Sequence, residues 1–176
     1  TIEFLYENEM FYFIEMNTNS FVESTLWKDA IGKTVCQDRR KVSFSLPDSK
    51  SRAIDFEITL IASVGDLTFG DTKEGSFGIR MAPSFRLKGK VAKGSALNSD
   101  GIAGKSVWGK RASWISYWAP FNDEEIGISI FDHPSNFRHP TWWHARDYGL
   151  VAANPFGASN FEGEPKQIFK RPDHVE

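Results

Sequence analysis

The sequence predicts an all-β fold, an antiparallel β-sandwich. Apolar and polar residues alternate with a period of two along several segments, and β-branched and aromatic residues are frequent in those segments. Turn signals rich in Gly, Pro, Asn and Asp separate one segment from the next. This spacing is typical of strands joined by hairpins, so we expect antiparallel pairing.

Five segments carry the strand pattern. Residues 33–46 and 52–64 alternate or are rich in β-branched side chains, and residues 125–132 carry isoleucine at every second position. Residues 105–118 would place Trp108, Lys110 and Trp114 on one face of a strand. The segment YGLVAANPF, residues 148–156, is the last predicted strand. Residues 19–32 fit a helix and a strand ending at Gly32 about equally well.

Length and composition predict one domain over residues 1–176. The chain has 176 residues, of which 40% are hydrophobic, enough for a single core. Lys and Arg number 21 against 23 Asp and Glu, and no basic block is present, so nucleic acid is not an expected partner. No apolar run approaches the roughly 20 residues of a membrane-spanning helix. We therefore expect a soluble protein with no membrane partner, in a compartment that the sequence does not give.

The ends of the chain and its single cysteine add further expectations. Cys36 has no second cysteine with which to form an internal disulfide. The chain starts at Thr1 without a methionine and shows no signal-peptide pattern, which indicates a fragment or a processed chain. The exposed edge strands of a shortened sandwich would pair with another chain, so a homodimer is a further expectation.

The segment FDHPSNFRHPTWWHARDYG, residues 131–149, holds most of the candidate chemistry. It contains three of the four histidines, and Pro134 and Pro140 interrupt any regular element, so it reads as an ordered loop. In one interpretation Asp132 and its neighbours cap turns, the arginines bind backbone carbonyls and the tryptophans seal the core. That interpretation does not explain the choice of imidazole, which titrates near neutral pH. A functional site in this loop is the alternative.

In the functional interpretation each residue type has a role toward a sugar. Imidazole serves as general acid or base, a carboxylate orients it, arginine binds a carboxylate or oxyanion, and an indole stacks on the sugar ring. The catalytic candidates are His139, His144, Asp132 and Asp147. The ligand-binding candidates are Trp142, Trp143, Arg138 and Arg146, followed by Lys73, Glu74 and Lys110.

Two other functions stay open at this stage. A noncatalytic glycan-binding or interaction module would use the tryptophans and arginines for binding, while its histidines only form hydrogen bonds. A metal-binding protein would fold His133, His139 and His144 around one divalent transition metal such as zinc, copper or iron. The sequence itself requires no cofactor, and the cofactor is unknown.

Three segments carry a resemblance to a known family. FGDTKEGSFGIRMA, NSDGIAGKSVWGKRASW and GISIFDHPSNFRHPTWWHARDYGLVAANPFG resemble, in this order, the signature motifs of the bacterial PmoA-like family of unknown function. The resemblance covers residues 53–163 and implies a soluble, β-rich protein of carbohydrate metabolism. An enzyme would then be a carbohydrate-active lyase or hydrolase. The family name comes from methane monooxygenase, a membrane protein, and methane oxidation is not carried over to this chain.

The resemblance also implies that parts of the family domain are missing. Members carry an upstream segment of the form His-Pro-His-His-Arg-Gly, which this chain lacks, and the tail EPKQIFKRPDHVE does not resemble the closing strands of the family. We therefore expect a sandwich that is incomplete at both ends. The substrate, the reaction and the oligomeric state are not given by the sequence.

Overall fold

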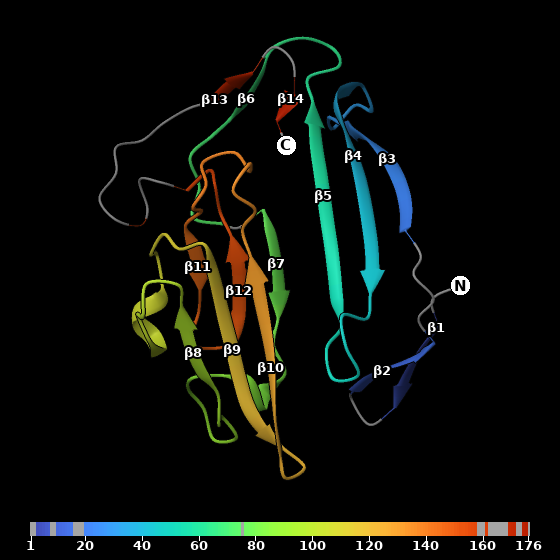
Figure 1. Ribbon diagram of the computed structural model, residues 1–176. Helices are drawn as coiled ribbons and strands as arrows, with labels where there is room; N and C mark the ends of the chain where they lie inside the picture. Colours follow the sequence, from blue (N-terminus) through green and yellow to red (C-terminus); the bar gives the residue numbers. More distant parts are fainter. Residues whose placement is uncertain are drawn as a thin grey trace. The chain divides into compact units, whose positions relative to one another are not determined.

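The computed structural model describes residues 3–7, 10–15, 20–74, 76–157, 161, 169–171 and 174–175. Short antiparallel sheets dominate it, which confirms the all-β class (Figure 1). The elements are β1 (Glu3–Glu7), β2 (Met10–Glu15), β3 (Ser20–Lys28), β4 (Thr34–Ser45), β5 (Ala53–Ile61), β6 (Leu67–Phe69), β7 (Phe77–Arg80), β8 (Ser95–Asn98), β9 (Trp114–Phe121), β10 (Glu124–Phe131), β11 (Trp143–Ala145), β12 (Leu150–Ala153), β13 (Phe169–Arg171) and β14 (His174–Val175), with 3₁₀ turns η1 (Pro83–Phe85) and η2 (Gly104–Val107).

One predicted strand is wrong in its first half. Residues 105–118 were expected to be extended, but the chain forms η2 at Gly104–Val107 and enters β9 only at Trp114. Gly104 and Gly109 adopt φ values of 61° and 72°, a left-handed conformation that breaks a strand. Trp108 therefore lies in a turn instead of sharing a strand face with Trp114. Residues 19–32, which fitted a helix and a strand about equally well, contain a strand, β3.

Contacts divide the chain into two compact units. Unit 1 comprises Thr1–Leu67 and Arg171–Glu176, and unit 2 comprises Thr68–Lys170. The prediction of one domain over residues 1–176 stays a prediction. The last residues of the segments that resemble the PmoA-like family, 158–160 and 162–163, lie outside the described residues.

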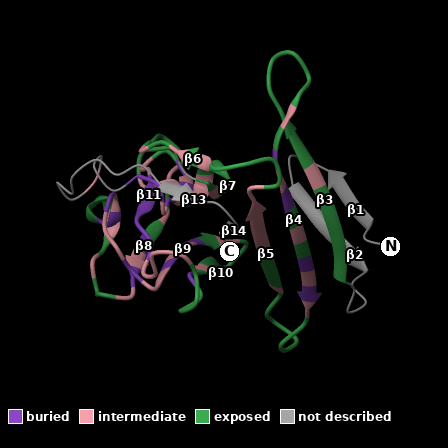
Figure 2. Ribbon diagram, turned by 90° about the horizontal axis from the view of Figure 1, so that it is seen from above, coloured by how far each residue is buried: buried purple, intermediate pink, exposed green. Residues whose placement is uncertain are grey.

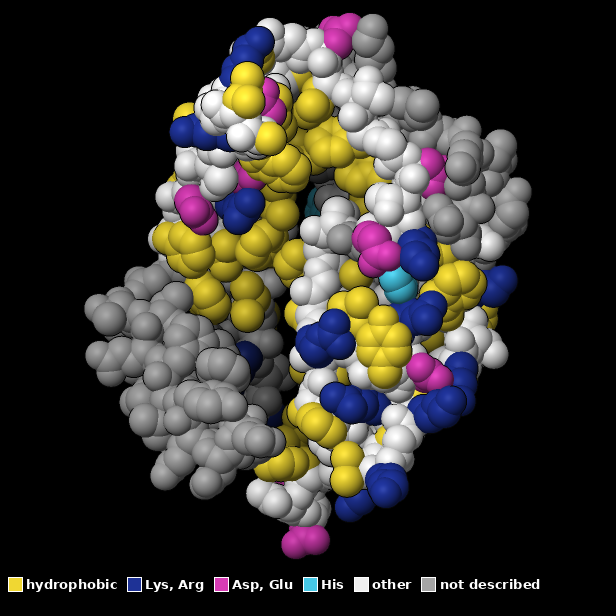
Figure 3. All heavy atoms as spheres, turned by 180° about the vertical axis from the view of Figure 1, so that it is seen from behind, with side chains coloured by type: hydrophobic (Ala, Val, Ile, Leu, Met, Phe, Trp, Pro, Cys, Tyr) yellow, Lys and Arg dark blue, Asp and Glu magenta, His cyan; other side chains and the backbone are white. Residues whose placement is uncertain are grey.

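Unit 1 contains the four-stranded sheet with the order β14-β5-β4-β3. Along β4 every second residue faces inward, so Cys36, Asp38, Val42 and Phe44 are buried while their neighbours are more exposed (Figure 2). This is the period-two burial of a sheet that covers a core on one face. Figure 3 shows apolar side chains that remain at the surface of this unit; the exposed ones include Phe21, Leu26, Trp27, Ile54 and Phe56.

The buried carboxylate of Asp38 is satisfied within its own sheet. Trp27 Nε1 donates a hydrogen bond to Asp38 Oδ2 over 2.6 Å, and Arg40 Nη2 donates to the same oxygen over 2.9 Å. Arg40 Nε lies 2.9 Å from Asp38 Oδ1 and completes the ion pair. A buried charge without such partners would be costly, so these contacts make the polar residue compatible with an apolar face.

Unit 2 holds the main core. Its sheets have the orders β10-β9-β8 and β11-β12-β7. Alternate residues of β9, namely Ile115, Tyr117 and Ala119, point into a cluster that also contains Trp143 and Val151. A two-residue turn joins β9 to β10, and its residues Asn122 and Asp123 both adopt positive φ. Hairpins of this length require that conformation to match the twist of their strands.

Among the described residues, none of the helical segments is long and apolar enough to cross a membrane.

Candidate functional site

The carboxylate of Asp132 organises the loop between β10 and β11. The Asn136 side-chain amide donates to Asp132 Oδ1 over 2.8 Å, and the Thr141 backbone N–H donates to Oδ2 over 2.8 Å. His139 Nδ1 donates to the same Oδ2 over 2.8 Å. The Asp132 side chain is only 5% exposed, so its charge is held in place by three donors instead of by water. The structure thus brings together Asp132 and His139, one of the carboxylate–imidazole pairs that the sequence left open.

This contact fixes the tautomer of His139. Since the carboxylate accepts the Nδ1 proton, the lone pair of the neutral ring lies on Nε2. The His139 side chain is 20% exposed, so the ring reaches the surface. The pair has the arrangement of an oriented general base, although its use in a reaction stays a prediction.

The two adjacent tryptophans are structural and correct the expected stacking role. Trp143 is fully buried, and its Nε1 donates to the Ala112 carbonyl over 2.9 Å. Trp142 is 3% exposed, and the Cζ atoms of two guanidiniums, those of Arg111 and Arg138, lie 4.4 and 5.4 Å from its ring centroid. Neither ring has a face free for a sugar. The burial arises because the loop closes over the core of unit 2.

The arginines around Trp142 bind backbone carbonyls. Arg111 Nε donates to Pro140 O over 2.8 Å, and Arg138 Nη1 donates to Pro155 O over 2.9 Å. Arg138 also adopts a φ of 61°, which places its carbonyl within 3.2 Å of Arg111 Nη2. These contacts agree with the structural interpretation of the loop and explain Arg138 as a loop-closing residue.

The three loop histidines contact three different partners. His133 is exposed and its Nδ1 lies 2.7 Å from Ser135 Oγ, whereas His139 contacts Asp132. His144 is 4% exposed, and its Nδ1 donates to the backbone carbonyl of Lys73. In the part of the chain that the structure describes, no group of three His, Cys, Asp or Glu side chains could hold a metal ion. The three-histidine arrangement therefore does not form.

The last three ligand-binding candidates, Lys73, Glu74 and Lys110, lie in loops. Lys73 and Glu74 are exposed in the loop between β6 and β7, where Lys73 contributes its carbonyl to His144 and the Glu74 N–H donates to Thr72 Oγ1 over 3.2 Å. Lys110 is half-buried after η2, and its carbonyl accepts the Trp143 N–H over 3.0 Å. The described contacts of these three residues are thus largely made by backbone atoms.

A small pocket lies where η2 meets the end of the loop. Its volume is about 190 Å³, and it is lined by Lys105, Trp108, Ala145, Arg146 and Asp147. Backbone bonds of the β11–β12 turn hold the last two residues, since Arg146 N–H donates to Leu150 O over 2.7 Å and Gly149 N–H donates to Arg146 O over 3.0 Å. All lining residues belong to unit 2.

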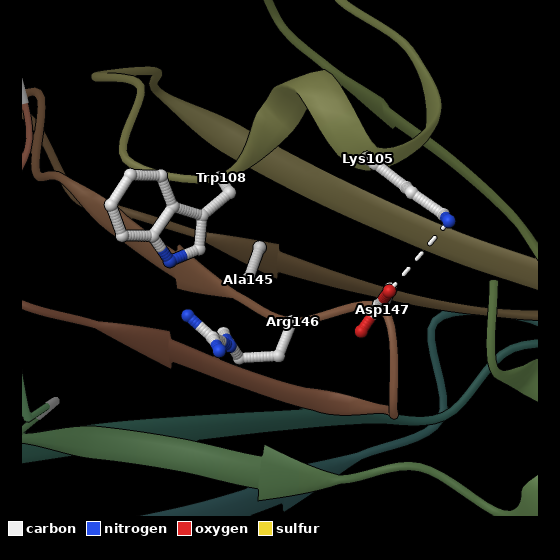
Figure 4. A pocket seen from close by; sticks show the side chains of 5 residues that line it. All are labelled: Lys105, Trp108, Ala145, Arg146 and Asp147. Carbon is white, nitrogen blue, oxygen red and sulfur yellow. Dashed lines mark ion pairs between the residues drawn. The ribbon is translucent and has the colours of Figure 1, made fainter. Parts of the chain in front are cut away.

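The polar groups of the pocket are only partly paired. Lys105 Nζ lies 3.7 Å from Asp147 Oδ2, a long ion pair at the rim (Figure 4). Opposite this pair, Figure 4 shows the nitrogen-bearing edge of the Trp108 indole turned toward the guanidinium of Arg146. Trp108 Nε1 is buried, and no described group accepts its hydrogen bond. A buried donor without an acceptor costs free energy. The indoles of Trp108 and Trp142 each carry one, and of the two only Trp108 lines the pocket.

The charge of Asp147 also affects the pKa of a core residue, Tyr117. Burial, and secondly the negative charge of Asp147, raise the pKa of the Tyr117 hydroxyl. That hydroxyl is buried, with no hydrogen-bond partner among the described groups. Tyr117 stays a neutral phenol throughout the physiological pH range, next to the anionic side of the pocket.

Sequence reasoning found two of the five residues that line this pocket. Arg146 and Asp147 were predicted as ligand-binding and catalytic candidates, whereas Lys105 and Trp108 were not assigned to the site. Trp108 was not recognised as a site residue because the sequence analysis placed it in a strand. The available signal was the pair Gly104 and Gly109, which bracket GKSVWG and indicate a turn.

The fold and this site define an all-β protein with a small, charged pocket beside an ordered loop. The model of the family of unknown function DUF6807 matches residues 14–172, and the chain belongs to that family. Neither the curated proteins nor the solved structures gave a match.

Proposed function

We propose that the protein binds a small polar ligand of the carbohydrate class in the pocket lined by Lys105, Trp108, Ala145, Arg146 and Asp147. The observation that carries this proposal is the buried indole N–H of Trp108, which faces the pocket without an acceptor. A ligand oxygen would satisfy it. The resemblance of the neighbouring segments to the PmoA-like family supports a sugar as the source of that oxygen.

The mixture of groups suits a polyhydroxylated molecule. Arg146 and Lys105 offer only donors, Asp147 offers only acceptors, and hydroxyl groups can satisfy both kinds. The volume of about 190 Å³ is below the roughly 300–1,000 Å³ of pockets that enclose drug-sized ligands, so the pocket fits a single sugar unit better than an oligosaccharide.

A thermal-shift titration of the full chain against monosaccharides tests the proposal. A ligand that binds only the folded state raises stability by about 2.7 kcal/mol at a hundredfold excess over Kd. We expect a shift with at least one sugar, and Trp108→Phe should abolish it because phenylalanine lacks the N–H. Trp118→Phe, on β9, is the matched control and should keep the shift. Absence of a shift with every neutral and acidic sugar would reject the proposal.

A second candidate function is acid–base catalysis by His139, and the Asp132–His139 contact favours it. A lyase or hydrolase acting on a sugar would use Nε2 as the base. His139→Gln would then remove turnover while leaving binding at the pocket intact. Turnover of an identified sugar substrate that survives this substitution would exclude the role.

A further inference from the structure

The pocket residues carry more positive than negative charge. Lys105 and Arg146 face one carboxylate, that of Asp147. The sequence of unit 2, to which the pocket belongs, has the same sign: residues 68–170 contain thirteen Lys and Arg against ten Asp and Glu, a net charge of +3, although the whole chain is at −2. Figure 3 shows Lys and Arg side chains gathered on this unit. The local field therefore favours an anionic ligand.

Two groups that can only donate hydrogen bonds face each other across one side of the pocket. The indole N–H of Trp108 and the guanidinium of Arg146 point toward one another in Figure 4, and neither can accept from the other. Among the described residues, no protein hydrogen bond or ion pair is made by the Arg146 guanidinium; its recorded partner is the Tyr148 ring, 5.5 Å from Cζ. An acceptor with several lone pairs could pair with both donors at once.

A carboxylate fits this space better than a phosphate does. The guanidinium fork matches the two oxygens of a planar carboxylate, and a charge-assisted bond from it is stronger than a neutral one. Asp147 lines the same pocket and would repel a second negative charge, which a phosphate monoester carries in part at neutral pH. Asp147 can instead accept hydrogen bonds from ligand hydroxyls, as the Lys105 contact is long.

We propose that the ligand is a monosaccharide-sized sugar acid, whose carboxylate lies between Trp108 Nε1 and Arg146 and whose hydroxyls face Asp147. This inference rests on the proposed function and adds the charge of the ligand to it. Lys105, 59% exposed at the rim, contributes long-range attraction. The preference for an acid over a neutral sugar is thus assigned to Arg146.

Calorimetric titration of the full chain with four probes tests this: glucuronate, glucuronate methyl ester, glucose and acetate, at constant ionic strength. We expect glucuronate to bind at least about tenfold more tightly than the ester and glucose, equivalent to about 1.4 kcal/mol. The ester keeps the ring and removes the charge while the protein is unaltered, so this comparison does not depend on any variant folding. Acetate should bind more weakly than glucuronate because it has no hydroxyls for Asp147.

Protein variants then locate the carboxylate. Arg146→Gln should lower glucuronate affinity about tenfold or more and glucose affinity by a smaller factor, because only the acid loses a charge-assisted pair. Arg80→Gln is the matched control, because the Arg80 guanidinium contacts the same Tyr148 ring at 5.8 Å without lining the pocket. It should bind glucuronate like the wild type.

Every other outcome of these titrations rejects the inference, the proposed function or both. Equal binding of glucuronate, ester and glucose, all lost in Trp108→Phe, would reject the sugar acid and keep the proposed function. Acetate binding as tight as glucuronate would reduce the pocket to a simple carboxylate site, and tighter binding of inorganic phosphate would replace the carboxylate by a phosphate; either result rejects the inference. No binding by any probe or neutral sugar would reject both proposals.

Discussion

Single residues show how burial changes the chemistry that a side chain offers. Cys36 is 1% exposed on the inner face of β4. Burial, and secondly the nearby negative charge of Asp38, raise the pKa of its thiol. The thiolate is the reactive form, so both effects protect this cysteine from alkylation. It is a core residue, as its position between alternating strand residues indicates.

This protection gives a prediction at the residue scale. The native chain should react with iodoacetamide at pH 8 far more slowly than the chain unfolded in urea, where the thiol is exposed and its pKa is ordinary. Because the folded pKa is raised, the contribution of the thiol to stability is complete below its unfolded pKa and is lost as pH rises through the folded value. Mass spectrometry of labelled protein measures the rate. Equal rates in the two states would contradict the prediction.

Residue types alone did not separate buried from available side chains in the loop. The adjacent tryptophans Trp142 and Trp143 looked like a stacking platform, yet both are buried, and Trp142 packs against the guanidiniums of Arg111 and Arg138. A loop has no periodicity that assigns its side chains to an inner or outer face, whereas a strand does. Asp132 and His139 were among the candidates, but the sequence left open which carboxylate, Asp132 or Asp147, would orient which imidazole.

Elements with strict alternation were predicted well, because their side chains alone determine which face is buried. β4, β5 and β10 lie within two or three residues of the predicted bounds. The strand expected at residues 105–118 failed because its alternation of large and small residues crosses Gly109, whose backbone is left-handed. Because Trp108 was assigned to this strand, it was not recognised as a pocket residue. A turn brings together residues that a strand would separate.

At the scale of the loop, Asp132 should be its most sensitive position. In Asp132→Asn the side chain keeps one acceptor oxygen, while the amide nitrogen cannot accept from the donors that it faces. Each unsatisfied buried group costs about 1–3 kcal/mol. We expect the free energy of unfolding to fall by about 2 kcal/mol in urea denaturation.

The exposed Asp123, in the β9–β10 turn, supplies the control for this change. Asparagine tolerates the left-handed backbone as well as aspartate does, so Asp123→Asn should leave stability unchanged within about 0.5 kcal/mol. A similar small effect of Asp132→Asn would show that water replaces the three donors, contrary to the burial of the carboxylate.

At the scale of the molecule, the division into two units was not visible in the sequence. It follows from which distant segments pair, for example β7 with β12 and β5 with β14. The core cluster consists entirely of residues between Met81 and Val151, all in unit 2. Unit 1 keeps several large apolar side chains exposed, including Ile54 and Phe56.

This asymmetry predicts different behaviour of the isolated units. A fragment of residues 68–170 should unfold cooperatively on heating and keep the near-ultraviolet circular dichroism of its buried tryptophans, because its core is complete within those residues. A fragment of residues 1–67 should show no cooperative transition, since few of its apolar side chains are buried. A broad, non-cooperative melt of residues 68–170 would show that its core needs the rest of the chain.

The two-residue turn at Asn122 and Asp123 also bears on the order of events during folding. Strands joined so closely can pair within about 1–10 μs, because almost no chain has to be closed into a loop. β7 and β12 lie far apart in the sequence and must wait for a slower search. The β9–β10 hairpin is therefore available early as a template, and β9 presents Ile115 and Tyr117 to the segments that arrive later.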